Sequence, residues 1–201
     1  MGIETSYLRQ AAYALKGAMG SAEEIEKIVI NHSLGAAASA VASGWIPGAG
    51  GVVASGIGLG FTLSMYCRLC KNSNIPLNKN KLKAVASVAI AEIAAYLAVV
   101  IAAETLLTFI PVLGSFGASA IAGICNFAMV YIAGILFLKL MLSFTKKSRD
   151  IASMSVEELK RAMKYEANGV FMKDMFKEAK SVYKSAKNDS KYDEKDFGSM
   201  D

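Results

Sequence analysis

Charged and metal-binding side chains are scarce in this sequence of 201 residues. Asp, Glu, Lys and Arg make up 19% of it, against about 25% in an ordinary soluble domain, and hydrophobic residues make up 54%. His32 is the only histidine, and the C-x-x-C pair Cys67 and Cys70 has no second pair to complete a zinc site. We therefore expect no metal site, and we interpret both cysteines as small apolar residues at the end of a helix.

Motifs for catalysis and nucleotide binding are also missing. The sequence has no Gly-rich phosphate loop followed by Lys and Ser or Thr, and no catalytic group is recognisable around its single histidine. The net charge of +5 is concentrated beside apolar segments, which is typical of membrane topology signals and not of a nucleic-acid surface. We therefore expect a protein that is not an enzyme and that binds neither a cofactor nor nucleic acid.

Strand signals are absent, and two long segments lack charge. Apolar residues recur at spacings of three and four or fill whole segments, so the sequence predicts an all-α protein. Residues 33–67 and 111–138 contain no Asp, Glu, Lys, Arg or His. About 20 apolar residues span a bilayer as a helix, so both segments are long enough for an integral membrane protein. A soluble, alanine-rich helical core is the alternative interpretation.

Two Ile-Pro turns interrupt the apolar segments. Proline ends a helix because it lacks an N–H group and clashes with the preceding turn, and each proline is followed by a glycine. The turn residues are Pro47, Gly50, Pro111 and Gly114. Because the flanking sequences also match in register, we favour a duplicated helical hairpin over a chance likeness of alanine-rich helices.

These signals divide the chain into four parts. In order, we expect amphipathic cytoplasmic helices at 1–33, a membrane domain at 34–145, amphipathic helices at 146–187 and a disordered tail at 188–201. The membrane domain consists of helical hairpins at 34–70 and 82–145. The second hairpin is long enough to span a bilayer, whereas the first is either re-entrant or packed against other subunits.

Basic residues predict the orientation of the hairpins. The linker between them and the exit of the last apolar helix are rich in Lys and Arg, whereas both Ile-Pro turns are uncharged. A basic excess marks cytoplasmic helix ends, so we expect both termini to be cytoplasmic. No signal-peptide pattern is present at residues 1–32, and the expected location is the bacterial inner membrane.

Two glutamates, Glu92 and Glu104, lie inside an apolar helical segment. A carboxylate costs at least about 2.5 kcal/mol at the bilayer centre, so it normally faces protein or water. Asn126 and Tyr131 on the returning helix are candidate hydrogen-bond donors to Glu92. We expect these four side chains to form an intramembrane polar seam that lines a pore or fixes assembly. Protonated or snorkelling glutamates are the alternative.

Small residues at four-residue spacing form rows that allow helices to approach closely. Close backbone contact is a main source of helix association in lipid. The rows contain Gly56, Gly60, Ser64, Ser115, Ser119 and Gly123. They predict tight packing within the chain or between subunits, and we expect a homo-oligomer in the lipid bilayer.

A basic amphipathic helix is predicted near the C-terminus, after a capping box at Ser155 and Glu158. One face of this helix is apolar, and the other carries lysines. These are Lys173, Lys177, Lys180, Lys184 and Lys187. The basic face suits an anionic membrane surface or a partner helix. A solvated face is the alternative, because Asp174 and Glu178 lie between the lysines.

Four short stretches within residues 36–142 carry a family resemblance. They are the small-residue run ending in Ile46-Pro47-Gly48, then Tyr66-Cys67-Arg68-Leu69, Pro76-Leu77 and Phe109-Ile110-Pro111-Val112-Leu113-Gly114. With them the chain resembles the YcjF-like family, bacterial membrane domains of unknown function that often accompany GTPases. The resemblance implies a membrane-associated partner of a GTPase, with no catalytic residues to transfer. This sequence has no GTPase domain, so the GTPase would be a separate protein.

We therefore expect a non-enzymatic, oligomeric membrane protein that acts as a scaffold or membrane-shaping partner. A pore or channel built from the hairpins is the first alternative, and a soluble form that hides them until triggered is the second. The three hypotheses differ in whether the apolar hairpins face lipid, line a lumen or lie inside the protein.

Overall fold

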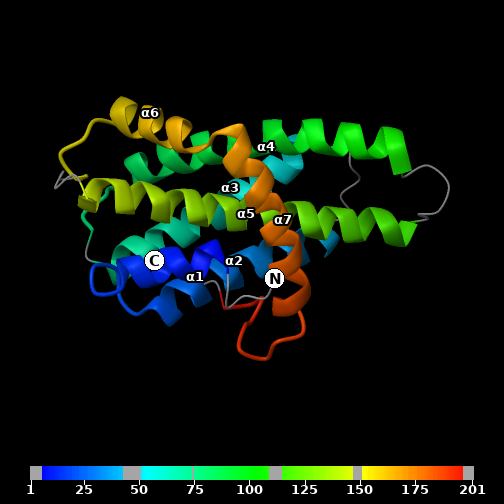
Figure 1. Ribbon diagram of the computed structural model, residues 1–201, viewed down its shortest axis with the longest axis horizontal. Coiled ribbons are helices and arrows are strands. Elements are labelled where there is room, and N and C mark those ends of the chain that lie inside the picture. Colours follow the sequence, from blue (N-terminus) through cyan, green and yellow to red (C-terminus); the bar gives the residue numbers. More distant parts are fainter. Residues whose placement is uncertain (1–5, 43–50, 74, 109–114, 147–150, 197–201) are drawn as a thin grey trace.

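A computed structural model describes the chain as a bundle of α-helices (Figure 1). The described residues are 6–42, 51–73, 75–108, 115–146 and 151–196, and of residues 51–55, 101–108 and 115–120 only the backbone is described. The helices are α1 (Tyr7–Leu15), α2 (Ala22–Ala42), α3 (Gly51–Asn72), α4 (Lys79–Thr108), α5 (Ser115–Lys146), α6 (Val156–Glu166) and α7 (Gly169–Ala186). This part of the chain has no strand, so the all-α prediction is confirmed.

Short polar side chains start several helices. The Ser6 and Asn168 side chains accept hydrogen bonds from backbone N–H groups in the first turns of α1 and α7, at 3.2 and 3.0 Å. Ser155 and Glu158 form the predicted capping box of α6. Between α1 and α2 the chain turns through Gly17 and Gly20, whose φ angles of 87° and 94° favour glycine.

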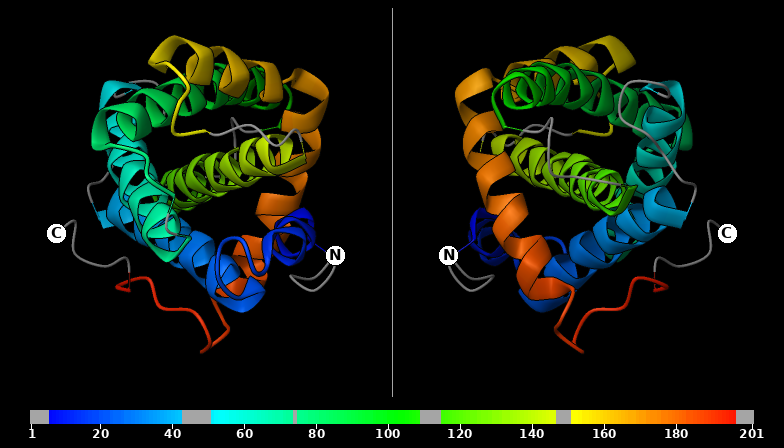
Figure 2. Two further views of the ribbon diagram at one scale, coloured as in Figure 1. Left: turned by 90° about the vertical axis from the view of Figure 1, so that its left-hand side faces the viewer. Right: turned by 90° about the vertical axis from the view of Figure 1, so that its right-hand side faces the viewer.

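Helix α5 lies at the centre of the bundle and contacts all six other helices. The end-on views show α5 surrounded by α2, α3, α4 and α7 (Figure 2). Two stretches in the described part of the chain are long and apolar enough to cross a membrane. Lys79–Val100 in α4 is 33% buried, whereas Ile121–Lys146 in α5 is 89% buried. Both belong to the second predicted hairpin, but α5 is also the core helix of the bundle.

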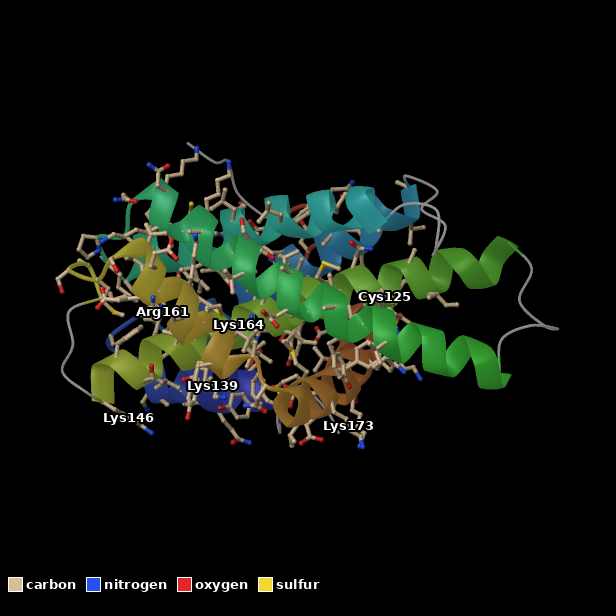
Figure 3. The ribbon with its side chains drawn as sticks, turned by 90° about the horizontal axis from the view of Figure 1, so that it is seen from above. Cys125, Lys139, Lys146, Arg161, Lys164 and Lys173 are labelled. Atoms are coloured by element: carbon tan, nitrogen blue, oxygen red, sulfur yellow. The ribbon has the colours of Figure 1, made fainter. Side chains whose placement is uncertain are left out.

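Different helix termini lie at the two ends of the bundle. At one end, which we call the tip end, α2 and α4 finish and α3 and α5 begin, and α4 and α5 extend past α2 and α3 (Figures 1 and 3). At the other end, the linker end, α3 and α5 finish and α4 begins, and Lys146 lies there (Figure 3). The predicted turns at Pro47, Gly50, Pro111 and Gly114 lie outside the described residues.

The structure describes helices and contacts across two of the predicted domain boundaries. Helix α2 runs without a break from Ala22 to Ala42 along α5, so no structural boundary separates 1–33 from the membrane domain. The expected disordered tail, 188–201, is described as far as Asp196 and contacts α2 and α3. Side-chain hydrogen bonds and ion pairs hold residues 188–196, which their polar composition alone did not indicate.

Candidate functional site

The most apolar helix of the chain is covered by helices whose outer faces are charged. Leu8 and Leu15 of α1, Leu159 of α6, and Met172 and Val182 of α7 are buried in the core that contains α5. Each such side chain contributes about 1.5–3 kcal/mol when fully buried. We take this covered length of α5, with α1, α6 and α7, as the candidate functional site, because it is long and apolar enough to cross a membrane and yet is 89% buried.

Glu178 of α7 joins three of these helices. Its carboxylate accepts hydrogen bonds from the Tyr131 hydroxyl of α5 at 2.8 Å and from the backbone N–H groups of Tyr7 and Leu8 at 2.8 and 3.4 Å. The residue is only 8% exposed. A carboxylate at a helix N-terminus is stabilised by the unpaired N–H groups and the positive end of the helix dipole. Glu178 therefore acts as a latch between α1, α5 and α7.

A second buried carboxylate, Glu26 of α2, anchors the C-terminal segment. The Tyr192 hydroxyl donates to it at 2.6 Å, and Arg9 Nε and Lys191 Nζ lie 3.8 and 3.7 Å from its oxygens. Burial and the hydrogen bond to Glu26 raise the pKa of Tyr192 above its ordinary range. Two cations and one hydroxyl thus compensate a carboxylate that is 2% exposed.

Asp196 fixes the end of the described tail to α2 and α3. Arg68 Nη1 lies 3.1 Å from its carboxylate, and the Asn31 amide donates to it at 3.1 Å. The Asn31 carbonyl also accepts from the backbone N–H of Asp193 at 3.1 Å. The tail therefore connects α7 to the side of the bundle formed by α2 and α3.

Three residues of the predicted polar seam, Glu92, Asn126 and Tyr131, contact other parts of the described chain. Glu92 forms an ion pair with Lys164 of α6 at 3.4 Å and is about a third exposed. Tyr131 bonds to Glu178 instead, and the buried Asn126 amide donates to the Ala122 carbonyl at 3.1 Å. The side chain of Glu104 lies outside the described residues. Glu92 therefore faces α6. Asn126 bonds within α5, and Tyr131 bonds to α7.

The partner of Tyr131 had a signal in the sequence. Glu178 follows Met175 by three residues and precedes Val182 by four, so it belongs to the buried side of α7. From the sequence alone, Glu178 is placed with Asp174 among the lysines of this helix, and a carboxylate is rarely buried without a partner. The α1 N-terminus that compensates it is distant in sequence and could not be recognised.

The described residues of the predicted small-residue rows have different surroundings. Around Gly56 and Gly60 a Cβ atom would meet nothing within 4 Å among the described residues. Ser64 lies 3.3 Å from the His32 ring, and Gly123 faces the Tyr183 hydroxyl, which a Cβ would approach to 3.1 Å. The Ser115 and Ser119 side chains lie outside the described residues.

The closest helix approaches involve two other glycines. A Cβ added to Gly58 of α3 would lie 2.6 Å from Met129 Sδ, and one added to Gly134 of α5 would lie 2.8 Å from Val29 Cγ1. Spacing did not indicate Gly134, because Val130 and Leu138 lie four residues before and after it. Gly134 allows α2 to approach α5 closely.

The histidine and cysteines occupy structural positions. His32 is fully buried, with Nδ1 2.7 Å from the Ile28 carbonyl oxygen and Nε2 3.3 Å from Ser64 Oγ, so it connects α2 and α3. Burial raises the pKa of the Cys70 thiol to about 12, which makes it a poor nucleophile. In the described parts of the chain, no group of three or more His, Cys, Asp and Glu side chains could hold a metal ion.

The basic face of α7 points away from the bundle. Its exposed lysines are Lys173, Lys177, Lys184 and Lys187. The ammonium group of Lys180 lies 4.6 Å from the centre of the Phe176 ring. The apolar face of α7 packs in the core, so α7 is a fixed part of the bundle.

Comparison with known proteins identifies no relative. No family model matches the chain, and neither a curated protein nor a solved structure matches it. Any function must therefore be argued from the described geometry, and the resemblance to YcjF-like domains stays a prediction.

Proposed function

We propose that this protein is a non-enzymatic, membrane-binding helical bundle that inserts the tip end of its α4–α5 hairpin into one leaflet of a bilayer. One observation carries the proposal. The α4–α5 pair contains the two described stretches that are apolar enough for a membrane, Lys79–Val100 and Ile121–Lys146. At the tip end, both helices continue beyond these stretches and past α2 and α3 (Figures 1 and 3). Its function would be that of a scaffold or membrane-shaping wedge.

The exposed surface of α4 supports insertion. Only 33% of Lys79–Val100 is buried, and Ala95, Ala98 and Val99 near its end are exposed. Val99 is 69% exposed. Apolar surface of this kind is unfavourable in water and marks binding sites for protein or lipid. A bilayer would cover it without any change in the bundle.

The position of α7 sets the depth of insertion that we propose. The contact of Tyr183 with Gly123 is where α7 meets α5 near the tip end. Beyond Gly123, residues 115–122 extend α5 by about 12 Å at 1.5 Å per residue. This is less than the hydrocarbon core of about 30 Å, so the hairpin would enter one leaflet and would not cross the bilayer.

A triggered form is the second candidate, and the burial of α5 favours it. The stretch Ile121–Lys146 is 89% covered by other helices, although it is long enough to span. Full insertion would require α1, α6 and α7 to leave α5. A pore former that hides its hairpin until the latch at Glu178 opens is consistent with this arrangement.

The proposed scaffold would assemble through separate surfaces. We propose self-association along α3, where no described atom lies within 4 Å of a Cβ added at Gly56 or Gly60. A separate GTPase remains the candidate partner, on the basis of the resemblance of residues 36–142 alone.

Vesicle flotation with matched variants tests the proposed insertion. Val99→Asp at the tip-end half of α4 is compared with Tyr165→Asp in α6, because these side chains are 69% and 81% exposed and neither belongs to the core. On vesicles of neutral phosphatidylcholine, we expect wild type and Tyr165→Asp to bind alike and Val99→Asp to bind at least about tenfold more weakly. Equal binding of all three proteins, or no binding by wild type, would refute the proposal.

A further inference from the structure

We propose that the outer face of α7 binds the headgroups of anionic phospholipids and sets the depth to which the tip end inserts. This inference rests on the proposed function, because it assigns the lipid class that the inserted bundle recognises. Its observations are the charge of α7, the side of the helix on which the lysines lie, and the place where α7 crosses the bundle.

The outer face of α7 is more basic than its sequence indicated. The helix contains two acids, Asp174 and Glu178, and Glu178 is turned into the bundle, where it bonds to Tyr131 and to the start of α1. Only Asp174 remains beside the lysines. Lys173, Lys177, Lys184 and Lys187 are exposed, and none forms an ion pair with another described residue.

The contacts of α7 show which flank carries these charges. On one flank, the Phe171 ring contacts Tyr7 of α1 at 5.6 Å between ring centres, and Glu178 bonds to Tyr7. On the opposite flank, Tyr183 reaches Gly123 and contacts the Phe127 ring at 5.1 Å. At about 100° per residue, the lysines lie between the Tyr183 flank and the outer surface, whereas Asp174 lies toward α1.

The Tyr183 flank faces the tip end. Figure 1 shows α7 crossing the long axis of the bundle, with α1 on the linker-end side of it. From Gly123 to its start, α5 carries no charged residue, and the same holds for α2 from Ser33 onward. If the tip end is inserted, the lysines of α7 therefore lie where the uncharged parts of α5 and α2 begin, at the level of the lipid headgroups. In α4, Glu104 is an acid close to the tip-end terminus of the helix.

Charge complementarity selects the lipid class. A lysine close to an anionic membrane surface strengthens binding by about fivefold, and the effect decays within a Debye length of about 10 Å. Lysines at the linker end are too far away to contribute, since α4 alone is about 45 Å long from Lys79 to Thr108. Removal of four lysines from α7 should therefore weaken binding to anionic vesicles, whereas removal of four lysines from the linker end should not.

The test removes four lysines from either place. One variant carries Lys173→Gln, Lys177→Gln, Lys184→Gln and Lys187→Gln. The control carries Lys71→Gln, Lys79→Gln, Lys83→Gln and Lys146→Gln, four lysines that are also exposed. Binding is measured on phosphatidylcholine vesicles with and without phosphatidylglycerol, at low and high salt, and circular dichroism checks that each protein is folded.

We expect phosphatidylglycerol to strengthen binding of wild type and of the linker-end control by at least about tenfold at low salt. The α7 variant should lose this gain and keep its binding to phosphatidylcholine, and a variant with Arg at the same four positions should retain the gain. A gain that survives in the α7 variant would overturn the inference.

Other outcomes point elsewhere. Equal loss of the gain in both glutamine variants would overturn the inference and favour a bilayer at the linker end. No gain in wild type would also overturn it and indicate an acidic protein partner for α7. Failure of the proposed insertion is separate, because it appears as lost sensitivity to Val99→Asp on neutral vesicles.

Discussion

The hydroxyl of Tyr131 donates a 2.8 Å hydrogen bond to Glu178, a residue 47 positions later in the chain. Both side chains are buried, and the carboxylate also accepts from the start of α1. This hydrogen bond joins the amphipathic helix α7 to α5, which is apolar enough to cross a membrane. We expect the stability of the covered form to depend on this contact, and under the proposed triggered form the exposure of α5 to lipid would depend on it too.

Removal of the carboxylate should weaken the folded state. In Glu178→Ala, the Tyr131 hydroxyl and the Tyr7 N–H lose a buried partner, and each unsatisfied donor costs about 1–3 kcal/mol. We expect the free energy of unfolding to fall by about 2–4 kcal/mol in urea titrations. Asp174→Ala removes an exposed acid of the same helix and should change it by less than about 0.5 kcal/mol. A similar loss in both variants would show that Glu178 is not a latch.

Loss of the latch should also permeabilise vesicles. Once α1 and α7 leave α5, the stretch Ile121–Lys146 is free, and its 26 residues would extend about 39 Å, enough to cross a bilayer. We expect wild type to bind dye-loaded vesicles without leakage and Glu178→Ala to release the dye. Rapid leakage with wild type would instead support a constitutive pore and contradict the wedge.

Two glycines should respond in opposite ways to the same substitution. Gly134→Ala places a Cβ 2.8 Å from Val29, so α2 and α5 must separate, and overpacking of this kind costs about 1–3 kcal/mol. Gly60→Ala adds a Cβ where no described atom lies within 4 Å, and alanine favours the helix by up to about 1 kcal/mol. Thermal unfolding measures both effects. Destabilisation by Gly60→Ala would indicate that this position is packed, for example in a homo-oligomer.

Glu92 should be dispensable for stability and for any ion or dye flux. It pairs with Lys164, whose side chain is 72% exposed, and exposed ion pairs contribute about 0–1 kcal/mol. We expect Glu92→Gln and Lys164→Gln to unfold within about 1 kcal/mol of wild type and to bind vesicles equally. If Glu92→Gln abolished the leakage caused by Glu178→Ala, the predicted polar seam would form in the inserted state after all.

The docked tail should be released by loss of one cation. Arg68 lies 3.1 Å from Asp196, whereas Lys27 lies 4.0 Å from it. We expect Arg68→Gln to speed trypsin cleavage after Lys191 and Lys195 several-fold, with Lys27→Gln close to wild type. The free energy of global unfolding should change little, because the tail can open locally while the helices stay folded. Equal cleavage of the two variants would show that Arg68 does not hold the tail.

Several features of the fold could be predicted because they depend on local patterns. The capping box at Ser155 and Glu158 follows from two side chains three residues apart, and its geometry is present as expected. The long uncharged segment around Phe127 predicted an apolar helix of spanning length, and α5 is that helix. The basic face of α7 also follows from helical spacing alone.

The partners of these helices could not be predicted. The apolar face of α7 suits lipid and protein equally, because both remove it from water. The predicted contact between Glu92 and Tyr131 requires these two residues to face each other across α4 and α5. In the fold, α6 packs against α4, and its Lys164 forms an ion pair with Glu92. Helix α7 packs against α5, and its Glu178 accepts the hydrogen bond from Tyr131.

By itself, the sequence determined that the chain is helical, that its charges flank two long apolar segments, and that lysines line one face of the last helix. These properties follow from amino-acid composition and from the spacing of apolar and charged residues, which can be read within a few helical turns. Only the tertiary structure decided that α5 is covered by α1, α6 and α7, that Glu178 turns inward, and that α4 and α5 extend at the tip end. Such relations join residues far apart in the chain, where a buried polar group finds its partner only after the helices have packed.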